Sequence, residues 1–403
     1  MRRVVVTGLG IISSIGWKKE VFWRALVSGQ SGISPAKAFD TQDFKVHNTA
    51  EVKDFDPSGY LNYEFSKQYG KAAQFALCAS EFAINDSLLD IKNINLSRIG
   101  VVLGTTMGEA QVFQQLVEKK IHSDFEPRDR TLIMQYPLEN IPQAIAKFFH
   151  LEGPNAIFPT ACSSGNYAIS YGYDCIKDKR ADFMLCGGVD VISVIAFTGF
   201  ARMLSIAPDT CQPFDRNRKG IIVGEGCAIL LLEDFDNAIK RNAHIYAEIL
   251  GYGLSCDAYH MTSPHPQGYG ASIAMRKCLK ESGLNLEDVS YINAHGTGTQ
   301  ANDKAETIAI KDVFGSLAYK IPVSSIKSML GHTMGAASAI EAAACCLSID
   351  KQIIPPTINY QTKDPDCDLD YVPNQARHIN VKNIISNAFA FGGNNACVGF
   401  GKV

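Results

Sequence analysis

The same order of elements occurs twice along this chain, and the repetition limits the folds open to it. In each set an apolar strand ending in glycine precedes a helical stripe and a second strand. The sets lie at residues 4–10, 70–86 and 98–106, and at residues 245–253, 271–283 and 289–294. Strands that alternate with helices build layered α/β folds with largely parallel sheets. We therefore predict two related halves, 1–240 and 241–403, fused without a flexible linker.

The first strand contains two glycines, Gly8 and Gly10, at a spacing found in dinucleotide-binding turns. Position 13 is serine where the third glycine of that pattern would stand, and no acidic residue follows at the expected distance. We therefore predict a tight strand-to-helix turn at this point and no nucleotide site.

The composition indicates a soluble globular protein. The 403 residues are 46% hydrophobic and 20% charged, and the net charge of -3 gives no general reason to bind nucleic acid or a membrane surface. No apolar run approaches the roughly 18 residues of a membrane span, and the first residues resemble a strand more than a signal peptide. The 12 cysteines lack metal-ligand spacing, which predicts reduced thiols in a cytoplasmic protein and no metal site.

Cys162 is predicted to lie at a strand-to-helix elbow. Residues 156–158 form a short apolar run, small residues follow, and helical spacing begins at residue 166. A thiol at the start of a helix meets unpaired backbone N–H groups and the positive end of the helix dipole. Both favour the nucleophilic thiolate. The alternative is a buried structural cysteine, which is the more common fate of a free thiol.

Two histidines strengthen the catalytic interpretation. His295 directly follows a predicted strand, and His332 precedes an alanine-rich helix at residues 334–349. Ligands usually bind at the carboxyl ends of such strands. The helix also carries Glu341, and a buried carboxylate needs a partner, for which Lys327 is the candidate.

A cysteine with two histidines is compatible with three kinds of site. A zinc site is disfavoured by the spacing of the residues. A cysteine hydrolase needs only one histidine, oriented by Asn or Asp. A thioester-handling enzyme would use both imidazoles to stabilise a developing enolate.

Seven motifs spread over the chain resemble those of elongating β-ketoacyl–acyl carrier protein synthases in the thiolase superfamily. They are Thr160-Ala161-Cys162-Ser163-Ser164-Gly165, Pro213-Phe214-Asp215, Gly224-Glu225-Gly226, Asp257-Ala258-Tyr259-His260-Met261-Thr262, His295-Gly296-Thr297-Gly298-Thr299, Lys327-Ser328-Met329-x-Gly331-His332 and Phe389-Ala390-Phe391-Gly392-Gly393. The resemblance implies a five-layered αβαβα thiolase fold. It also implies decarboxylative condensation of a carrier-bound acyl chain with malonyl carrier protein, in fatty acid or type II polyketide elongation.

The resemblance assigns expected functions to individual residues. Cys162 would hold the acyl chain, His295 and His332 would support decarboxylation, and Lys327 with Glu341 would form the ion pair behind His332. The remaining assignments are the oxyanion hole and gate at Cys162, Phe391 and Phe389, the pantetheine contacts Thr297 and Thr299, the acyl pocket at Met107, and the carrier-docking residues Arg128, Arg130 and Arg202.

The implied partner is an acyl carrier protein, whose phosphopantetheine carries the substrates, so no cofactor of the enzyme's own is expected. A homodimer is implied, or a heterodimer with a chain-length-factor-like homologue. Two alternatives remain. A non-catalytic partner subunit would not need Cys162, His295 and His332, and a coenzyme A-dependent thiolase would use a second cysteine. Cys397 matches the thiolase letters, but its apolar strand predicts a core position.

Four positions depart from the pattern of the family: Ile221, Ser338, Ala390 and Asn394. Ala390 replaces a glycine in the loop that carries Phe391. Because glycine reaches positive φ freely, we expect the added Cβ to restrict the loop and to bias the position of the Phe391 ring. The alternative is that Ala390 already has a negative φ and that the hinge lies at Gly392-Gly393.

Overall fold

The computed structural model describes residues 2–126 and 129–403. At its centre is an 11-stranded sheet made of two five-strand halves, with β2 (Gly16–Trp17) attached to β1. The first half has the order β6 (Asn155–Phe158), β5 (Ile99–Gly104), β7 (Phe183–Asp190), β8 (Gly226–Asp234) and β1 (Val4–Ser13). The second has the order β11 (Val323–Ser324), β10 (Val289–Asn293), β14 (Asn383–Phe389), β15 (Asn394–Gly401) and β9 (Ala247–Cys256).

The two half-sheets have the same topology. In each, the first three strands in the order are parallel, and the last two are antiparallel to their neighbours. The halves meet where β1 pairs with β9 over Val4–Val6. The repetition predicted from the sequence is therefore confirmed as a repeated topology. A division at residue 240 falls between β8 and β9 and stays a prediction.

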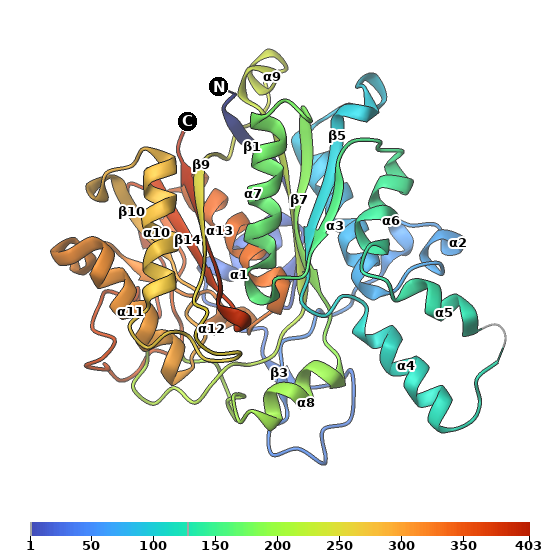
Figure 1. The fold of residues 1–403 in the computed structure, drawn as a ribbon, viewed down its shortest axis with the longest axis horizontal. Coiled ribbons are helices and arrows are strands. Elements are labelled where there is room, and N and C mark those ends of the chain that lie inside the picture. Colours follow the sequence, from blue (N-terminus) through green and yellow to red (C-terminus); the bar gives the residue numbers. More distant parts are fainter. Residues whose placement is uncertain (1, 127–128) are drawn as a thin grey trace.

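Helices and half-sheets stack in five layers, which Figure 1 shows side by side. One outer layer contains α3 (Lys71–Ser87) and α6 (Asn140–Phe149), which pack on the first half-sheet. The middle layer contains α7 (Ser164–Lys177) and α13 (Ala337–Lys351), which contact both half-sheets. The other outer layer contains α10 (Tyr269–Ser282), packed on β9 and β15, and its neighbour α11 (Gln300–Phe314).

The remaining elements lie around these layers. The helices are α1 (Lys19–Val27), α2 (Tyr63–Ser66), α4 (Ala110–Ile121), α5 (Arg130–Gln135), α8 (Val194–Arg202), α9 (Phe235–Lys240) and α12 (Lys327–Leu330). Two small sheets pair β3 (Ser34–Pro35) with β4 (Asn48–Thr49), and β12 (Ile353–Ile354) with β13 (Arg377–His378). No helix in the described part of the chain is both long enough and apolar enough to cross a membrane.

Small residues allow the middle layer to be buried on all sides. Residues 337–349 of α13 are all buried, and six of its first eight residues are alanine or serine. A Cβ added to Gly165 of α7 would lie 2.7 Å from the backbone nitrogen of Ala339. The Oγ of Ser338 accepts a hydrogen bond from the backbone N–H of Asn166 at 3.0 Å. The serine at this atypical position therefore ties the first turn of α7 to α13.

The prediction of a glycine turn in the first strand is wrong. β1 continues through Gly8 and Gly10 to Ser13. A Cβ at Gly10 would lie 1.8 Å from the carbonyl oxygen of Ala79 in α3. The glycines therefore allow the helix to lie directly on the strand, which is a requirement of packing and one that periodicity along a single strand does not indicate.

Candidate active site

Seven of the residues singled out in the sequence line one cavity of about 390 Å³: Cys162, His295, Thr297, Thr299, His332, Phe389 and Phe391. Cys162 lies in the short 3-10 turn Ala161–Ser163, which leads directly into α7, so the predicted elbow is confirmed. The side chains of Cys162, His295 and His332 all line the cavity and are buried. The cysteine sulfur and one ring nitrogen of each histidine lie within 4.8 Å of one another. The donor atoms of such a group could also hold a metal ion. The spacing of these residues in the sequence disfavours that alternative.

The expected lowering of the Cys162 pKa is not what the structure gives. Burial raises the pKa of this thiol to about 12, and the charge of Lys327 and the backbone N–H groups of Phe391 and Cys162 oppose the change only in part. The cause is desolvation, because a thiolate inside the protein loses its water. The sequence indicated the helix start but gave no measure of burial. At neutral pH the resting group is therefore a thiol.

The two histidines are neutral for the same reason. Burial lowers the pKa of His295 and of His332 well below the ordinary value, and nearby Lys327 lowers both further. Their rings lie 5.5 Å apart at an angle of 82°. Nδ1 of His332 accepts the backbone N–H of Met334 at 3.1 Å. The proton of neutral His332 is therefore on Nε2, which leaves that nitrogen as a hydrogen-bond donor.

Behind His332 lies a buried ion pair. Lys327 Nζ contacts Glu341 Oε1, and both side chains are 2% exposed. Burial raises the pKa of Glu341 to about 7, and the attraction of Lys327 opposes that rise. The pairing expected from the sequence is present. A buried pair of this kind contributes little net stability but leaves an uncompensated charge when one partner is removed.

Two carboxylates of α11 hold the loop that carries His295. Glu306 accepts the backbone N–H groups of His295 and Gly296, each at 2.8 Å. Asp303 accepts those of Thr297 at 3.0 Å and Gly298 at 3.2 Å. The sequence analysis did not single out Asp303 or Glu306. Their spacing of three residues, directly after the histidine motif, places them on one face of a helix and is the signal that was available.

Thr297 and Thr299 both line the cavity, as predicted for residues that contact a substrate arm. Their hydroxyl oxygens lie 2.9 Å apart, and the hydroxyl of Thr299 accepts the backbone N–H of Asn302 as the N-cap of α11. The start of the helix and the wall of the cavity are therefore the same short segment.

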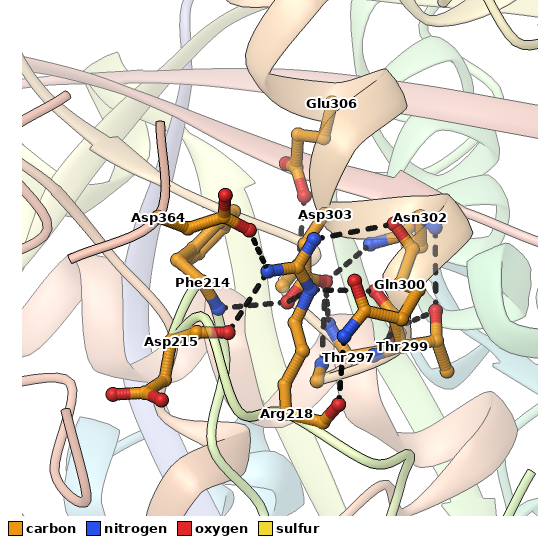
Figure 2. A network of polar contacts seen from close by, with 12 residues as sticks. Phe214, Asp215, Arg218, Thr297, Thr299, Gln300, Asn302, Asp303, Glu306 and Asp364 are labelled. Carbon is orange, nitrogen blue, oxygen red and sulfur yellow. Dashed lines mark hydrogen bonds and ion pairs between the residues drawn. The ribbon is translucent and has the colours of Figure 1, made fainter. Parts of the chain in front are cut away.

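A buried arginine connects this segment with the preceding loop, as Figure 2 shows. The guanidinium of Arg218 contacts Asp364 and lies 3.6 Å from Asp303. Its Nε donates to the carbonyl oxygen of Thr299 at 3.2 Å, and Gln300 Nε2 donates to the carbonyl oxygen of Arg218 at 2.9 Å. The loop around Arg218 is therefore rigidly attached to the start of α11.

The aromatic residues of the C-terminal loop also line the cavity. Phe389 ends β14, and the centroid of its ring lies 6.0 Å from that of the His295 ring. The ring of Phe391 is half-buried, and its centroid lies 5.9 Å from that of the Phe200 ring. Ala390 has φ -117° and ψ 158°, an extended conformation that any residue adopts. The positive φ angles belong to Gly392 (78°) and Gly393 (77°). The argument from φ for a restricting effect of Ala390 is therefore wrong, since the positive φ angles of this loop come after Phe391.

Other predicted residues lie apart from the three reactive groups. Met107 follows β5, is half-buried and does not line the cavity; its backbone N–H is held by Asp190 at 2.8 Å. Arg130 is exposed at the first position of α5. Arg202 is exposed at the end of α8, directly before Met203 and Leu204, which line the cavity mouth. Arg128 lies outside the described residues.

Family models match both halves of this chain. Residues 1–238 match the beta-ketoacyl synthase N-terminal domain, and residues 246–361 match the beta-ketoacyl synthase C-terminal domain. The chain belongs to the β-ketoacyl synthase family.

Curated β-ketoacyl synthase relatives align over the whole chain. The chain is 42% identical to 3-oxoacyl-[acyl-carrier-protein] synthase 2 of Synechocystis sp., covering 100% of this chain and 98% of the relative. It is 40% identical to nodulation protein E of Rhizobium meliloti, with 100% of each chain covered.

Solved structures agree with this membership and with the thiolase fold. The ishigamide ketosynthase/chain length factor superposes with a TM-score of 0.96 at 40% identity, covering 100% of this chain and 99% of that one. A ketosynthase bound to the hexaketide, in complex with its type II polyketide synthase acyl-carrier protein, gives a TM-score of 0.92 at 33% identity with the same coverage. The five layers and the repeated half-sheets of this β-ketoacyl synthase are thus those of solved ketosynthases.

Proposed function

We propose that the chain catalyses decarboxylative condensation of a carrier-bound acyl chain with malonyl carrier protein, giving a β-ketoacyl carrier protein. The observation that carries the proposal is the convergence of one thiol and two neutral imidazoles in a buried cavity. The names of the curated relatives support it, since they describe 3-oxoacyl-[acyl-carrier-protein] synthases. The chain elongated belongs to fatty acid or type II polyketide synthesis.

In the first step Cys162 takes the acyl group. The Cys162 sulfur attacks the thioester carbonyl of the acyl carrier, and the thiol proton passes to the carrier sulfur as the carbon–sulfur bond of the carrier breaks. Because burial raises the pKa of the Cys162 thiol to about 12, proton loss must accompany attack instead of preceding it. The product is an acyl thioester on Cys162 and a free carrier thiol.

In the second step malonyl carrier protein loses its carboxylate as CO2, and the electron pair of the broken bond forms an enolate. His332 donates a hydrogen bond from Nε2 to the enolate oxygen. The imidazole of His295 helps to stabilise the same negative charge. Neutral donors suit this task, because they stabilise charge that develops during the reaction without first attracting the malonyl carboxylate. The tautomer of His332 set by Met334 supports this assignment.

The enolate carbon then attacks the carbonyl of acyl-Cys162. The negative oxygen that forms would accept the backbone N–H groups of Cys162 and Phe391, which already lie near the sulfur. Collapse expels the Cys162 sulfur, which takes up a proton from the solvent, and the β-ketoacyl product stays on the carrier. Lys327 and Glu341 position His332, and the hydroxyls of Thr297 and Thr299 hold the pantetheine arm.

The proposed partners are an acyl carrier protein and a second ketosynthase-type subunit, identical or chain-length-factor-like. Two surface features support a subunit contact: β6 is the last strand of its half-sheet, and α4 and α5 expose apolar side chains. Ile121 of α4 and Met134 of α5 are each 71% exposed. Two solved relatives are described together with chain length factors. No cofactor of the enzyme's own is needed, because the substrates arrive on phosphopantetheine.

Intact-mass measurement of the protein after exposure to a panel of acyl carrier proteins tests the proposal. We expect an added acyl mass that disappears in Cys162→Ala, followed by release of CO2 and of the acyl group when malonyl carrier protein is added. A non-catalytic partner subunit would gain no acyl mass. A coenzyme A-dependent thiolase would transfer acyl groups without releasing CO2, and either result would overturn the proposal.

A further inference from the structure

A single lysine lies at the mouth of the catalytic cavity. Among the described residues that line this cavity, Lys219 is the one lysine or arginine. Its side chain is exposed, and no carboxylate in the described ranges forms an ion pair with it. The acidic residue on the same wall, Asp257, is already engaged by the backbone N–H of His265 at 2.9 Å and the side chain of Asn395 at 2.8 Å. Lys219 therefore has a positive charge available to a ligand.

The backbone on both sides of Lys219 is tied to the loop that carries Thr297 and Thr299. The carbonyl oxygen of Arg218 accepts Gln300 Nε2 at 2.9 Å, and the N–H of Gly220 donates to the carbonyl oxygen of Gly298 at 2.9 Å. The buried guanidinium of Arg218 holds the same segment through its contacts with Asp303 and Asp364, as Figure 2 shows. Lys219 is thus a cation held on a rigid frame and is not a residue of a mobile surface loop.

We propose that Lys219 binds the phosphate of the phosphopantetheine arm, an anion subsite at the mouth of the cavity. The inference rests on the proposed function, in which the thioester end of the arm reaches Cys162 and its amides pass Thr297 and Thr299. The other end of the arm is a phosphate diester, which must then lie where the cavity opens. Lysine is a common phosphate ligand because its ammonium acts as a compact positive charge.

The test compares two small substrates that differ by the phosphate alone. Acylation of Cys162 is followed by intact mass as a function of the concentration of an acyl-pantetheine and of the same acyl group on 4′-phosphopantetheine. Lys219→Gln removes the charge at similar length, and Lys219→Arg restores a charge. Arg216→Gln is the matched control, since Arg216 is an exposed cation on the same loop that does not line the cavity.

We expect Lys219→Gln to raise KM about two- to fivefold for the phosphopantetheine thioester alone, the range of an exposed ion pair. Lys219→Arg should recover most of the loss, Arg216→Gln should change neither substrate, and the difference should shrink at high salt. An equal effect on both thioesters would overturn the phosphate site and leave the proposed function standing. An effect seen with intact carrier protein and not with the free arm would do the same. Failure of the unaltered protein to acylate Cys162 from any donor would overturn the proposed function together with it.

Discussion

Burial sets the protonation of the reactive side chains in this cavity. It raises the pKa of Cys162 and lowers those of His295 and His332, so all three groups are uncharged at neutral pH. A charged thiolate–imidazolium pair, as in cysteine hydrolases, would require the opposite shifts. The arrangement thus suits a reaction in which charge appears on the substrate and is stabilised there by neutral donors.

The histidine pKa values lead to a prediction about titration. For a buried histidine the folded pKa lies below the unfolded one, so the neutral form persists as the pH falls through 6.5. In spectra of protein with ¹³C-labelled histidine, we expect the His295 and His332 signals to stay unchanged from pH 7.5 to 5.5. Single His→Asn variants assign the signals. A midpoint near 6.5 for either buried histidine would contradict the proposed neutral donors.

The atypical Ser338 gives a second prediction at this scale. Its Oγ accepts the N–H of Asn166, which belongs to the first turn of α7 and would otherwise be an unpaired buried donor. Ser338→Ala should therefore lower the free energy of unfolding by about 1–3 kcal/mol. Ser348→Ala is the control on the same helix, because no partner within the described ranges bonds the buried Ser348 hydroxyl. Equal stability changes in the two variants, measured by urea denaturation, would show that the bond to Asn166 contributes nothing specific.

Among the elements, short segments at the ends of strands and helices form the site. Cys162 lies before α7, His295 after β10, and Phe391 after β14. The His295 loop is held by the helix that follows it, since Asp303 and Glu306 of α11 accept its backbone N–H groups. Rigid helices and strands thus position loops whose own sequences would allow many conformations.

The loop after β14 carries the prediction at this scale. Gly392 has φ 78°, whereas Ala390 is extended. Gly392→Ala should cost about 1–2 kcal/mol in this loop conformation and change the rate of acylation or of condensation severalfold. Ala390→Gly, the matched change, should alter both rates little. Pre-steady-state acylation and single-turnover condensation measure the two steps. The reverse ranking of the two variants would place the flexible position before Phe391.

On the scale of the whole molecule, α8 lies at the opposite end from α9 and the chain termini (Figure 1). Phe200 of α8, with Met203 and Leu204 directly after it, lines the cavity. If the proposed carrier protein is acidic, the net charge of -3 does not attract it, and docking would depend on local cations at this end. Of the arginines predicted for docking, Arg202 at the end of α8 is exposed and directly precedes Met203 and Leu204, which line the cavity.

Charge reversal at this end tests the docking surface. Arg202→Glu should raise KM for carrier-bound substrates several-fold and leave acyl-pantetheine unaffected, since the small thioester does not contact the surface around the entrance. Lys240→Glu is the control, because exposed Lys240 ends α9 at the far end of the molecule. If both variants weaken carrier-bound substrates equally, overall charge and not a docking patch governs recognition.

The sequence by itself determined the repeated strand–helix order, the elbow at Cys162, the two histidines at element ends and the pairing of Lys327 with Glu341. These features follow from local spacing and from residue chemistry, which neighbouring positions in the chain are enough to reveal. The tertiary structure decided the rest: the raised pKa of Cys162, the packing of Gly10 under Ala79, the carboxylates that hold the His295 loop, and the positive φ at Gly392 instead of Ala390. The pKa of Cys162 and the packing of Gly10 depend on which distant segments exclude water or approach a given atom. The carboxylates are close in sequence to the backbone groups that they hold, but their contacts depend on how the His295 loop folds onto α11. The periodicity of residues along one strand or helix does not indicate such contacts.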